Sequence, residues 1–236
     1  MAASPPDGES DETPLVFDDP VYRDAVVDLL GAVAYGEISA FERLAEDAKL
    51  APSLEDKVDI AAMASLQFSR VGPLHDRIRT LGADPFLAMA PFRQALDLFH
   101  EHTAPSDWWE SLVKAFVGDG LADDFYREIA AYLDPGTRDL VVASLDDVSS
   151  AFVVARVRAA IAADPRLGGR LALWGRRLMG EALTQAQRVA ADRDALSALL
   201  AGGVDRAGLD LAAIGRMFTR LTDRHAERMS ELGLSA

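Results

Sequence analysis

The chain has 236 residues and half of them are hydrophobic, which suits one large globular domain with a buried core. It contains no cysteine, which excludes disulfides and thiolate metal sites and favours a cytoplasmic location. The formal net charge of −14 disfavours broad non-specific binding to nucleic acid, because phosphate backbones are also negative. No apolar run reaches the roughly 18 residues of a membrane span, and the first residues lack the features of a signal peptide, so no membrane association is expected.

The charge is divided unevenly along the chain. Residues 166–236 carry 11 arginines against 8 acidic residues, whereas the preceding part is strongly acidic. Near the C-terminus four arginines recur at steps of four, at positions 216, 220, 224 and 228. They could meet a phosphate or the acidic part of the chain, but the acidic residues between them favour ordinary surface ion pairs.

The N-terminal segment and the first helix differ in composition. Residues 1–17 are acidic and proline-rich with few large apolar groups, which predicts a disordered tail. Asp18 or Asp19 then caps a helix that has Pro20 at its first helical position and extends to about Lys49.

A second helix is capped by Ser53 and extends to Leu81, with Pro73 inside it. Because proline cannot donate the backbone hydrogen bond of a helix, a kink is expected near Arg70. Residues 84–103 then form a long connection that has helical periodicity of its own.

Four further helices complete the chain. Their expected ranges are 106–133, with Ser106 as the cap, then 137–163, 165–200 and 205–232. No segment alternates in the manner of a strand bounded by turn signals.

The predicted fold is therefore all-α. Long antiparallel hairpins joined by a long crossover predict a ferritin-like four-helix bundle, with two additional C-terminal helices. Residues 18–200 would form the bundle together with the fifth helix. Residues 201–236 would form a C-terminal helix packed on the bundle.

One polar residue interrupts the apolar face of each of the four bundle helices. These residues are Glu37, Gln67, Asp119 and Asp146. Steps of three and four residues place each of them on the stripe that should face the core, at similar depth. In bundles of this kind two iron or manganese ions are held by a lone Glu from each of two helices and a Glu-x-x-His from each of the other two.

Four segments of the chain resemble the ferritin-like family related to the tRNA hydroxylase MiaE. They are AYGEISAFERLAEDAKLAP (34–52), MASLQFSR (63–70), PSDWWESLVKAFVGDGLADDFYREIA (105–130) and RLALWGRRLMGEALTQAQRVAADRDAL (170–196). The resemblance implies a non-haem di-iron site that activates dioxygen. It also implies tRNA as a partner, since the namesake enzyme hydroxylates a modified tRNA base.

The ligands of that family are altered at the matching positions. The lone Glu is present, the lone acid of the third helix is shortened to Asp, and the two Glu-x-x-His pairs have lost both histidines. The remaining acids at metal positions are Glu37, Asp119 and Asp146, and the altered ligand positions are Gln67, Arg70 and Ser149.

Arg70 is the most informative substitution, because arginine stays charged and forms bidentate bonds with carboxylates. We hypothesise that Arg70 replaces the metal and bridges Glu37 to Asp119 or Asp146. One guanidinium does not neutralise three carboxylates. Either one acid is protonated, or water enters, or one weakly bound cation remains.

Other polar residues carry weaker signals. His100 and His102 lie on the crossover, where solvent exposure is expected. Glu181 and Gln185 form an i, i+4 pair that could line a pocket, although a hydrogen bond at the helix boundary is the more usual role.

These features favour a catalytically silent scaffold or binding protein, for which no cofactor is expected. The alternative is a divergent non-haem oxygenase or hydroxylase that uses Glu37, Asp119 and Asp146 around iron or manganese. The sequence identifies no substrate. Apolar faces of the last two helices would allow a homodimer.

Overall fold

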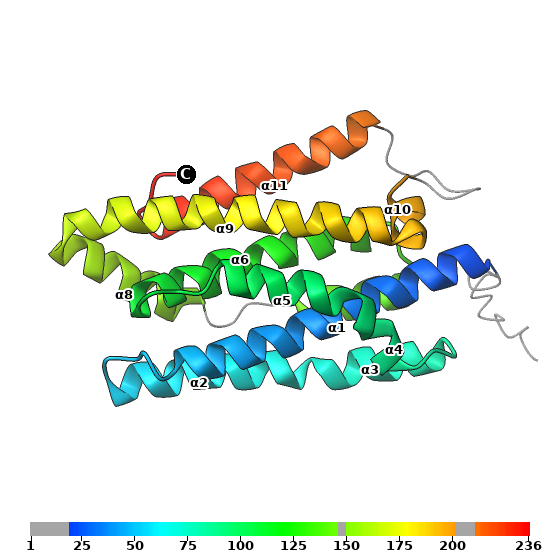
Figure 1. Ribbon diagram of the computed structural model, residues 1–236, viewed down its shortest axis with the longest axis horizontal. Coiled ribbons are helices and arrows are strands. Elements are labelled where there is room, and N and C mark those ends of the chain that lie inside the picture. Colours follow the sequence, from blue (N-terminus) through cyan, green and yellow to red (C-terminus); the bar gives the residue numbers. More distant parts are fainter. Residues whose placement is uncertain (1–18, 146–149, 202–210) are drawn as a thin grey trace, which may run out of the picture.

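The computed structural model describes residues 19–145, 150–201 and 211–236 (Figure 1). Within them the chain is helical and forms no strand, so the all-α prediction is confirmed. Over the same ranges every helix is too short or too polar to traverse a lipid bilayer.

The first hairpin consists of α1 (Pro20–Asp47) and a rod made of α2 (Leu54–Ser69) and α3 (Val71–Thr80). The side chain of Asp19 accepts a hydrogen bond from the backbone of Val21, so the predicted cap and the helical start at Pro20 are confirmed.

The rod of α2 and α3 begins and breaks where the sequence predicts. Ser53 Oγ accepts a hydrogen bond from the Asp56 backbone at 3.1 Å and donates to the Asp56 carboxylate at 2.7 Å. Arg70 is the residue at the break between the two helices, ahead of Pro73, which has no backbone N–H to continue the first helix.

The crossover is made of α4 (Pro85–Met89), a 3₁₀ turn labelled η2 (Ala90–Phe92) and α5 (Arg93–His102). It passes very close to α1, because a Cβ added to Gly31 would lie 2.2 Å from the backbone oxygen of Ala88. Only a glycine at this position allows α4 to lie so near to α1.

The second hairpin begins with α6 (Trp108–Ala130), whose N-cap is Asp107 rather than the predicted Ser106. The Asp107 side chain accepts from the backbone of Glu110, and Glu110 in turn accepts from the backbone and the hydroxyl of Ser106. Both residues can cap a helix, and the reciprocal contact with Glu110 moves Ser106 outside it.

The fourth bundle helix was expected to be continuous over 137–163, and this is wrong. It forms α7 (Pro135–Ser144), which ends with Leu145 as its C-cap, and α8 (Ser150–Ala163). Residues 146–149 lie outside the described ranges, so the candidate site residues Asp146 and Ser149 cannot be placed.

The fifth helix is also divided. It consists of α9 (Pro165–Asp192) and α10 (Asp194–Ala201). At the break the guanidinium of Arg193 bonds to the buried carboxylate of Asp28 on α1, with Nε at 3.0 Å from Oδ2. This tertiary contact accompanies a turn that the helical periodicity did not indicate. The last helix is α11 (Leu211–Glu231), and its predicted start at residue 205 lies outside the described residues.

The four bundle positions are held by α1, α2–α3, α6 and α7–α8, with the crossover between the two hairpins (Figure 1). Helix α9 runs along α6, and α11 packs on α6 and α9. This is the ferritin-like arrangement with a long crossover that the sequence predicts.

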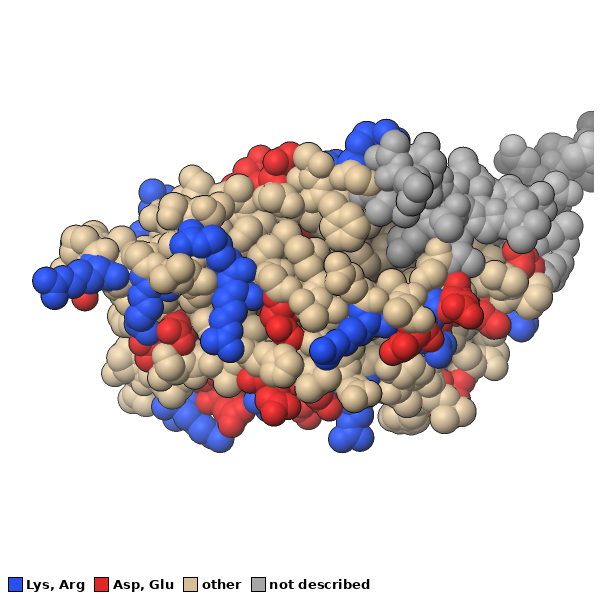
Figure 2. All heavy atoms as spheres, turned by 45° about the horizontal axis from the view of Figure 1, so that its top comes forward, with Lys and Arg blue, Asp and Glu red and all other residues tan. Residues whose placement is uncertain are grey.

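Three of the four C-terminal arginines form ion pairs with acidic side chains of the bundle. Arg228 Nη2 lies 2.8 Å from Asp124 Oδ2, and Arg220 Nη2 lies 2.6 Å from Glu128 Oε2, both acids being on α6. Arg224 reaches both acids. Basic and acidic side chains are correspondingly interspersed on the face of the molecule drawn in Figure 2.

Two large buried hydrophobic clusters fill the interior of the described structure, one towards each end of the bundle. The first includes Val33, Leu74, Ile129 and Val141, and the second includes Leu44, Ile60, Leu112 and Val153. Along α1 and the α2–α3 rod, Glu37, Gln67 and Arg70 fall between the two clusters. The bundle therefore has a polar level in its middle.

Candidate polar centre of the bundle

Arg70 joins two helices at this polar level. Its Nη1 lies 3.6 Å from Oε2 of Glu37 on α1 and donates a hydrogen bond of 2.8 Å to Oε1 of Gln67. Nε2 of Gln67 donates to Oδ2 of Asp119 on α6 at 3.3 Å. The predicted pairing of Arg70 with Glu37 is therefore present, and Gln67 links Arg70 to Asp119.

The break between α2 and α3 explains the position of Arg70. The residue at the break is the C-cap of one helix and the N-cap of the next, and its guanidinium extends inward to α1. The side chain is only 11% exposed, so its charge lies largely away from solvent. A buried charge of this kind is tolerated when polar partners surround it.

Glu37 is an acid of the centre with a strongly raised pKa. Burial raises its pKa to about 8, the charge of Arg70 opposes this rise, and the carboxylates of Asp123 and Asp119 add to it. Glu37 therefore holds a proton near neutral pH. Of the possibilities left open by the sequence, this favours one protonated acid beside the guanidinium.

Asp123 and Tyr126 belong to this centre and were not proposed as site residues. Asp123 lies one turn after Asp119 on α6, and both line a small pocket with Glu37. A Cβ added to Gly36 would lie 3.2 Å from the Tyr126 hydroxyl, so the tyrosine lies against α1. Burial raises the pKa of Tyr126, and the charges of Glu37 and Asp123 add to the rise. The available sequence signal was the spacing, because Asp123 follows Asp119 by four residues and Tyr126 follows Asp123 by three, which places all three on one face of the helix.

The predicted position of His100 is wrong. It was expected in solvent, yet it is half-buried and lines the same pocket as Glu37. Its Nε2 lies 3.3 Å from the Ser39 hydroxyl. Burial lowers its pKa to about 3, with Lys114 and Arg43 contributing, so the ring is neutral. The expectation fails because α5 packs onto the bundle instead of looping away from it.

Two further polar predictions are confirmed. His102 is exposed, with Nδ1 at 2.8 Å from Glu181 Oε1. Glu181 also accepts a hydrogen bond of 2.6 Å from Gln185 Nε2. The hydrogen bond expected within this pair is therefore present, and Gln185, which is buried, also lines a cavity.

Residues 20–203 match the family described as "Ferritin-like domain, actinomycetes". The chain belongs to this family. Among solved structures, "Protein 19 with aldehyde deformylating oxidase activity from Synechococcus" matches with a TM-score of 0.70 and 20% identity, covering 93% of this chain and 94% of that chain. At this identity the likeness shows a shared fold. No curated protein matches the chain.

The described residues of this ferritin-like domain do not fit a di-metal centre. They include no group of three or more His, Asp or Glu side chains placed to hold a metal ion. Gln67 and Arg70, which the sequence resemblance predicts to stand at the positions of one Glu-x-x-His pair, supply an amide and a guanidinium. The guanidinium is a permanent cation without an acceptor atom. The guanidinium lies against Glu37, the residue predicted to be the lone Glu of the first helix.

Proposed function

We propose that this ferritin-like domain is a non-catalytic binding protein in which Arg70 takes the place of the metal ions. The observation that carries the proposal is the contact of Arg70 with Glu37 at 3.6 Å, made from a position where the fold otherwise places a histidine ligand. A guanidinium supplies positive charge and hydrogen-bond donors, but it offers no site for dioxygen or substrate activation.

The protonation of Glu37 supports the same proposal. With a pKa of about 8, caused mainly by burial, Glu37 is neutral near pH 7. A neutral carboxyl group and a fixed guanidinium charge reduce the negative charge that would attract a divalent cation. The centre would therefore hold the helices in register as a hydrogen-bonded polar layer.

We infer further that the domain is related to the MiaE-like branch of ferritin-like proteins. The segments around Glu37, Gln67 and Asp119 support this relationship. The proposed replacement of the histidine ligands implies that tRNA hydroxylation has been lost. A homodimer through α9 and α11 is part of the proposal, supported by the exposed side chains of Leu173 and Phe218.

A divergent oxygenase is the second candidate, and one observation favours it. Asp123 and the neutral His100 line the same small pocket as Glu37 and Asp119, so a different set of ligand types converges there. The fold neighbour with aldehyde deformylating oxidase activity makes such chemistry a reasonable alternative.

Thermal unfolding in the presence of metal separates these candidates. A ligand that binds the folded state raises the melting temperature by mass action. We expect the melting temperature of the full chain to be unchanged by excess Fe(II), by Mn(II) or by a chelator. A rise with either metal that the chelator reverses would support the oxygenase and contradict the proposal.

A further inference from the structure

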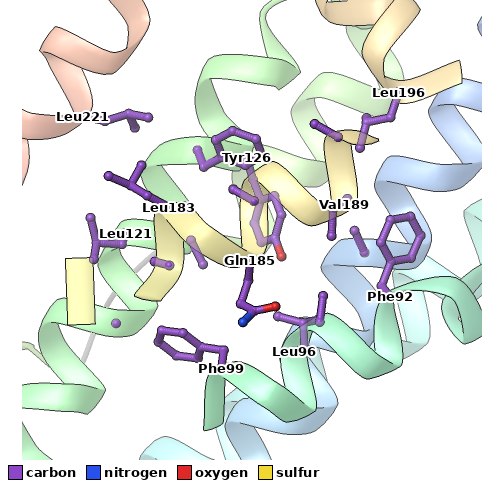
Figure 3. Close-up of a pocket in the computed structure, with 18 of the residues that line it drawn as sticks. Phe92, Leu96, Phe99, Leu121, Tyr126, Leu183, Gln185, Val189, Leu196 and Leu221 are labelled. Carbon is purple, nitrogen blue, oxygen red and sulfur yellow. The ribbon is translucent and has the colours of Figure 1, made fainter. Parts of the chain in front are cut away.

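A cavity of about 160 Å³ lies beside the polar centre, between α1, α5, α6 and α9 (Figure 3). Its walls are almost entirely aliphatic and aromatic, and include Leu29, Phe92, Leu96, Leu121, Leu183 and Val189. An engineered cavity of about 150 Å³ with a similar lining stays dry and binds benzene. The space therefore suits an apolar group of about six carbon atoms.

The polar groups of the cavity are few and uncharged. Among its described lining residues, Tyr126 and Gln185 alone have polar side chains, and no charged side chain takes part. Both are directed into the cavity in Figure 3. A ligand in this space could therefore form hydrogen bonds, but it would find no counter-ion.

Both polar groups have hydrogen-bonding capacity to spare. The Gln185 amide donates to Glu181 Oε1 at 2.6 Å and accepts from Arg188 Nη1 at 3.4 Å. These contacts hold the amide in place and leave a second N–H and a second lone pair for a ligand. The Tyr126 hydroxyl forms no hydrogen bond with another described residue, so it too is available.

We infer that this cavity binds a neutral, mainly apolar small molecule that carries one hydroxyl or carbonyl group. The hydrocarbon part would fill the space between α5, α6 and α9, and the oxygen would pair with Tyr126 or Gln185. A carboxylate or an ammonium group is disfavoured, because a buried charge without a partner costs far more than a neutral oxygen that is hydrogen-bonded.

The cavity adjoins the polar centre without being part of it. Tyr126, Leu96 and Phe99 line both spaces, so they form the wall between them. The inference deepens the proposed function by naming the class of ligand that the binding protein takes. It rests on that proposal in one respect, because a non-catalytic protein binds the ligand without converting it.

Isothermal titration calorimetry with 1-hexanol, benzene and hexanoate tests the inference on the full chain. We expect 1-hexanol and benzene to bind with one site per chain. Hexanoate should bind at least about tenfold more weakly at pH 7, since its charge has no partner in the cavity. Equal or tighter binding of hexanoate, or no binding of 1-hexanol and benzene, would overturn the inference.

Amino-acid substitutions test whether 1-hexanol binds in this cavity. Ala186→Phe places a ring in the cavity and should abolish binding of 1-hexanol, whereas Ala62→Phe on the exposed face of α2 should leave it unchanged. Gln185→Leu and Tyr126→Phe keep the shape of the cavity but remove a polar group. At least one of them should weaken the binding of 1-hexanol by roughly three- to tenfold, while the affinity for benzene stays the same. Binding of 1-hexanol that survives Ala186→Phe, or equal loss of both probes in the polar variants, would contradict the proposed site.

Metal content measured on the same samples separates this inference from the proposed function. If the protein contains stoichiometric metal and still binds 1-hexanol, the non-catalytic assignment is contradicted and the ligand site is supported. Metal-free protein that binds neither 1-hexanol nor benzene would remove the ligand site and keep the assignment.

Discussion

Arg70 and Glu37 meet in the interior of the bundle, with Nη1 and Oε2 separated by 3.6 Å and with side chains that are 11% and 7% exposed. The contact connects the break between α2 and α3 to the middle of α1. It occupies the level at which the two hydrophobic clusters divide. We propose that this permanent cation stands where related bundles bind metal.

Substitution of Arg70 by alanine should destabilise the protein by about 2 kcal/mol. The change leaves Gln67 Oε1 without its donor and removes the cation from beside Glu37 and Asp119. Chemical denaturation at pH 7 measures the effect.

Arg79→Ala is the matched control for that change. Arg79 forms an exposed pair with Asp76 at 2.8 Å within one helix, and its loss should cost less than about 1 kcal/mol. If the two variants are equally stable, Arg70 has no special role in holding the centre.

The raised pKa of Glu37 predicts a pH dependence. The folded state keeps a proton that the unfolded chain releases above its ordinary pKa of 4.5, and it holds that proton up to its own pKa of about 8. The contribution to stability is therefore complete below pH 4.5 and is lost as the pH rises towards 8, by at most about 1.4 kcal/mol for each pH unit.

Glu37→Gln isolates this contribution, because glutamine resembles the protonated acid and does not titrate. As the pH rises from 5 to 8, the wild type should lose stability relative to the variant. The difference between their unfolding free energies should change by on the order of a few kcal/mol in total. A difference that stays constant over this range would show that Glu37 is ionised throughout.

The sequence predicted the bundle well because its signals are local. Asp19 and Ser53 cap helices, and Pro73 predicts the break at Arg70. The pairing of Arg70 with Glu37 followed from the family resemblance, which implies that both residues stand at ligand positions. Contacts between distant segments were harder to foresee. His100 and Tyr126 reach the centre through the packing of α5 and α6, and the turn at Arg193 accompanies an ion pair with Asp28.

Asp124→Asn should loosen the attachment of α11 to α6. The carboxylate of Asp124 is 3% exposed and lies 2.8 Å from Arg228 and 3.6 Å from Arg224. Removing its charge leaves these arginines without their shared partner, at a cost of about 2 kcal/mol. Hydrogen exchange of the α11 amides should become faster, whereas Asp76→Asn on the surface should leave it unchanged. Unchanged protection in Asp124→Asn would mean that apolar packing alone holds α11.

Gly31→Ala tests the close approach of the crossover to α1. The added methyl group would lie 2.2 Å from the backbone oxygen of Ala88, so α4 must move, at a cost of about 2 kcal/mol. Gly72→Ala is the control, since a Cβ there meets nothing within 4 Å and should stabilise α3 by roughly 0.5 kcal/mol. Melting temperatures of the two variants should move in opposite directions. A shared direction would indicate that α4 is not held against α1.

If a guanidinium stands in place of the metal ions, the protein should be free of bound iron and manganese, and its metal content shows whether this is so. The full chain should be produced with excess iron and, separately, manganese, desalted, and analysed for metal per chain by mass spectrometry. We expect no stoichiometric iron or manganese in either preparation. Two ions per chain, the complement of a working ferritin-like centre, would contradict it.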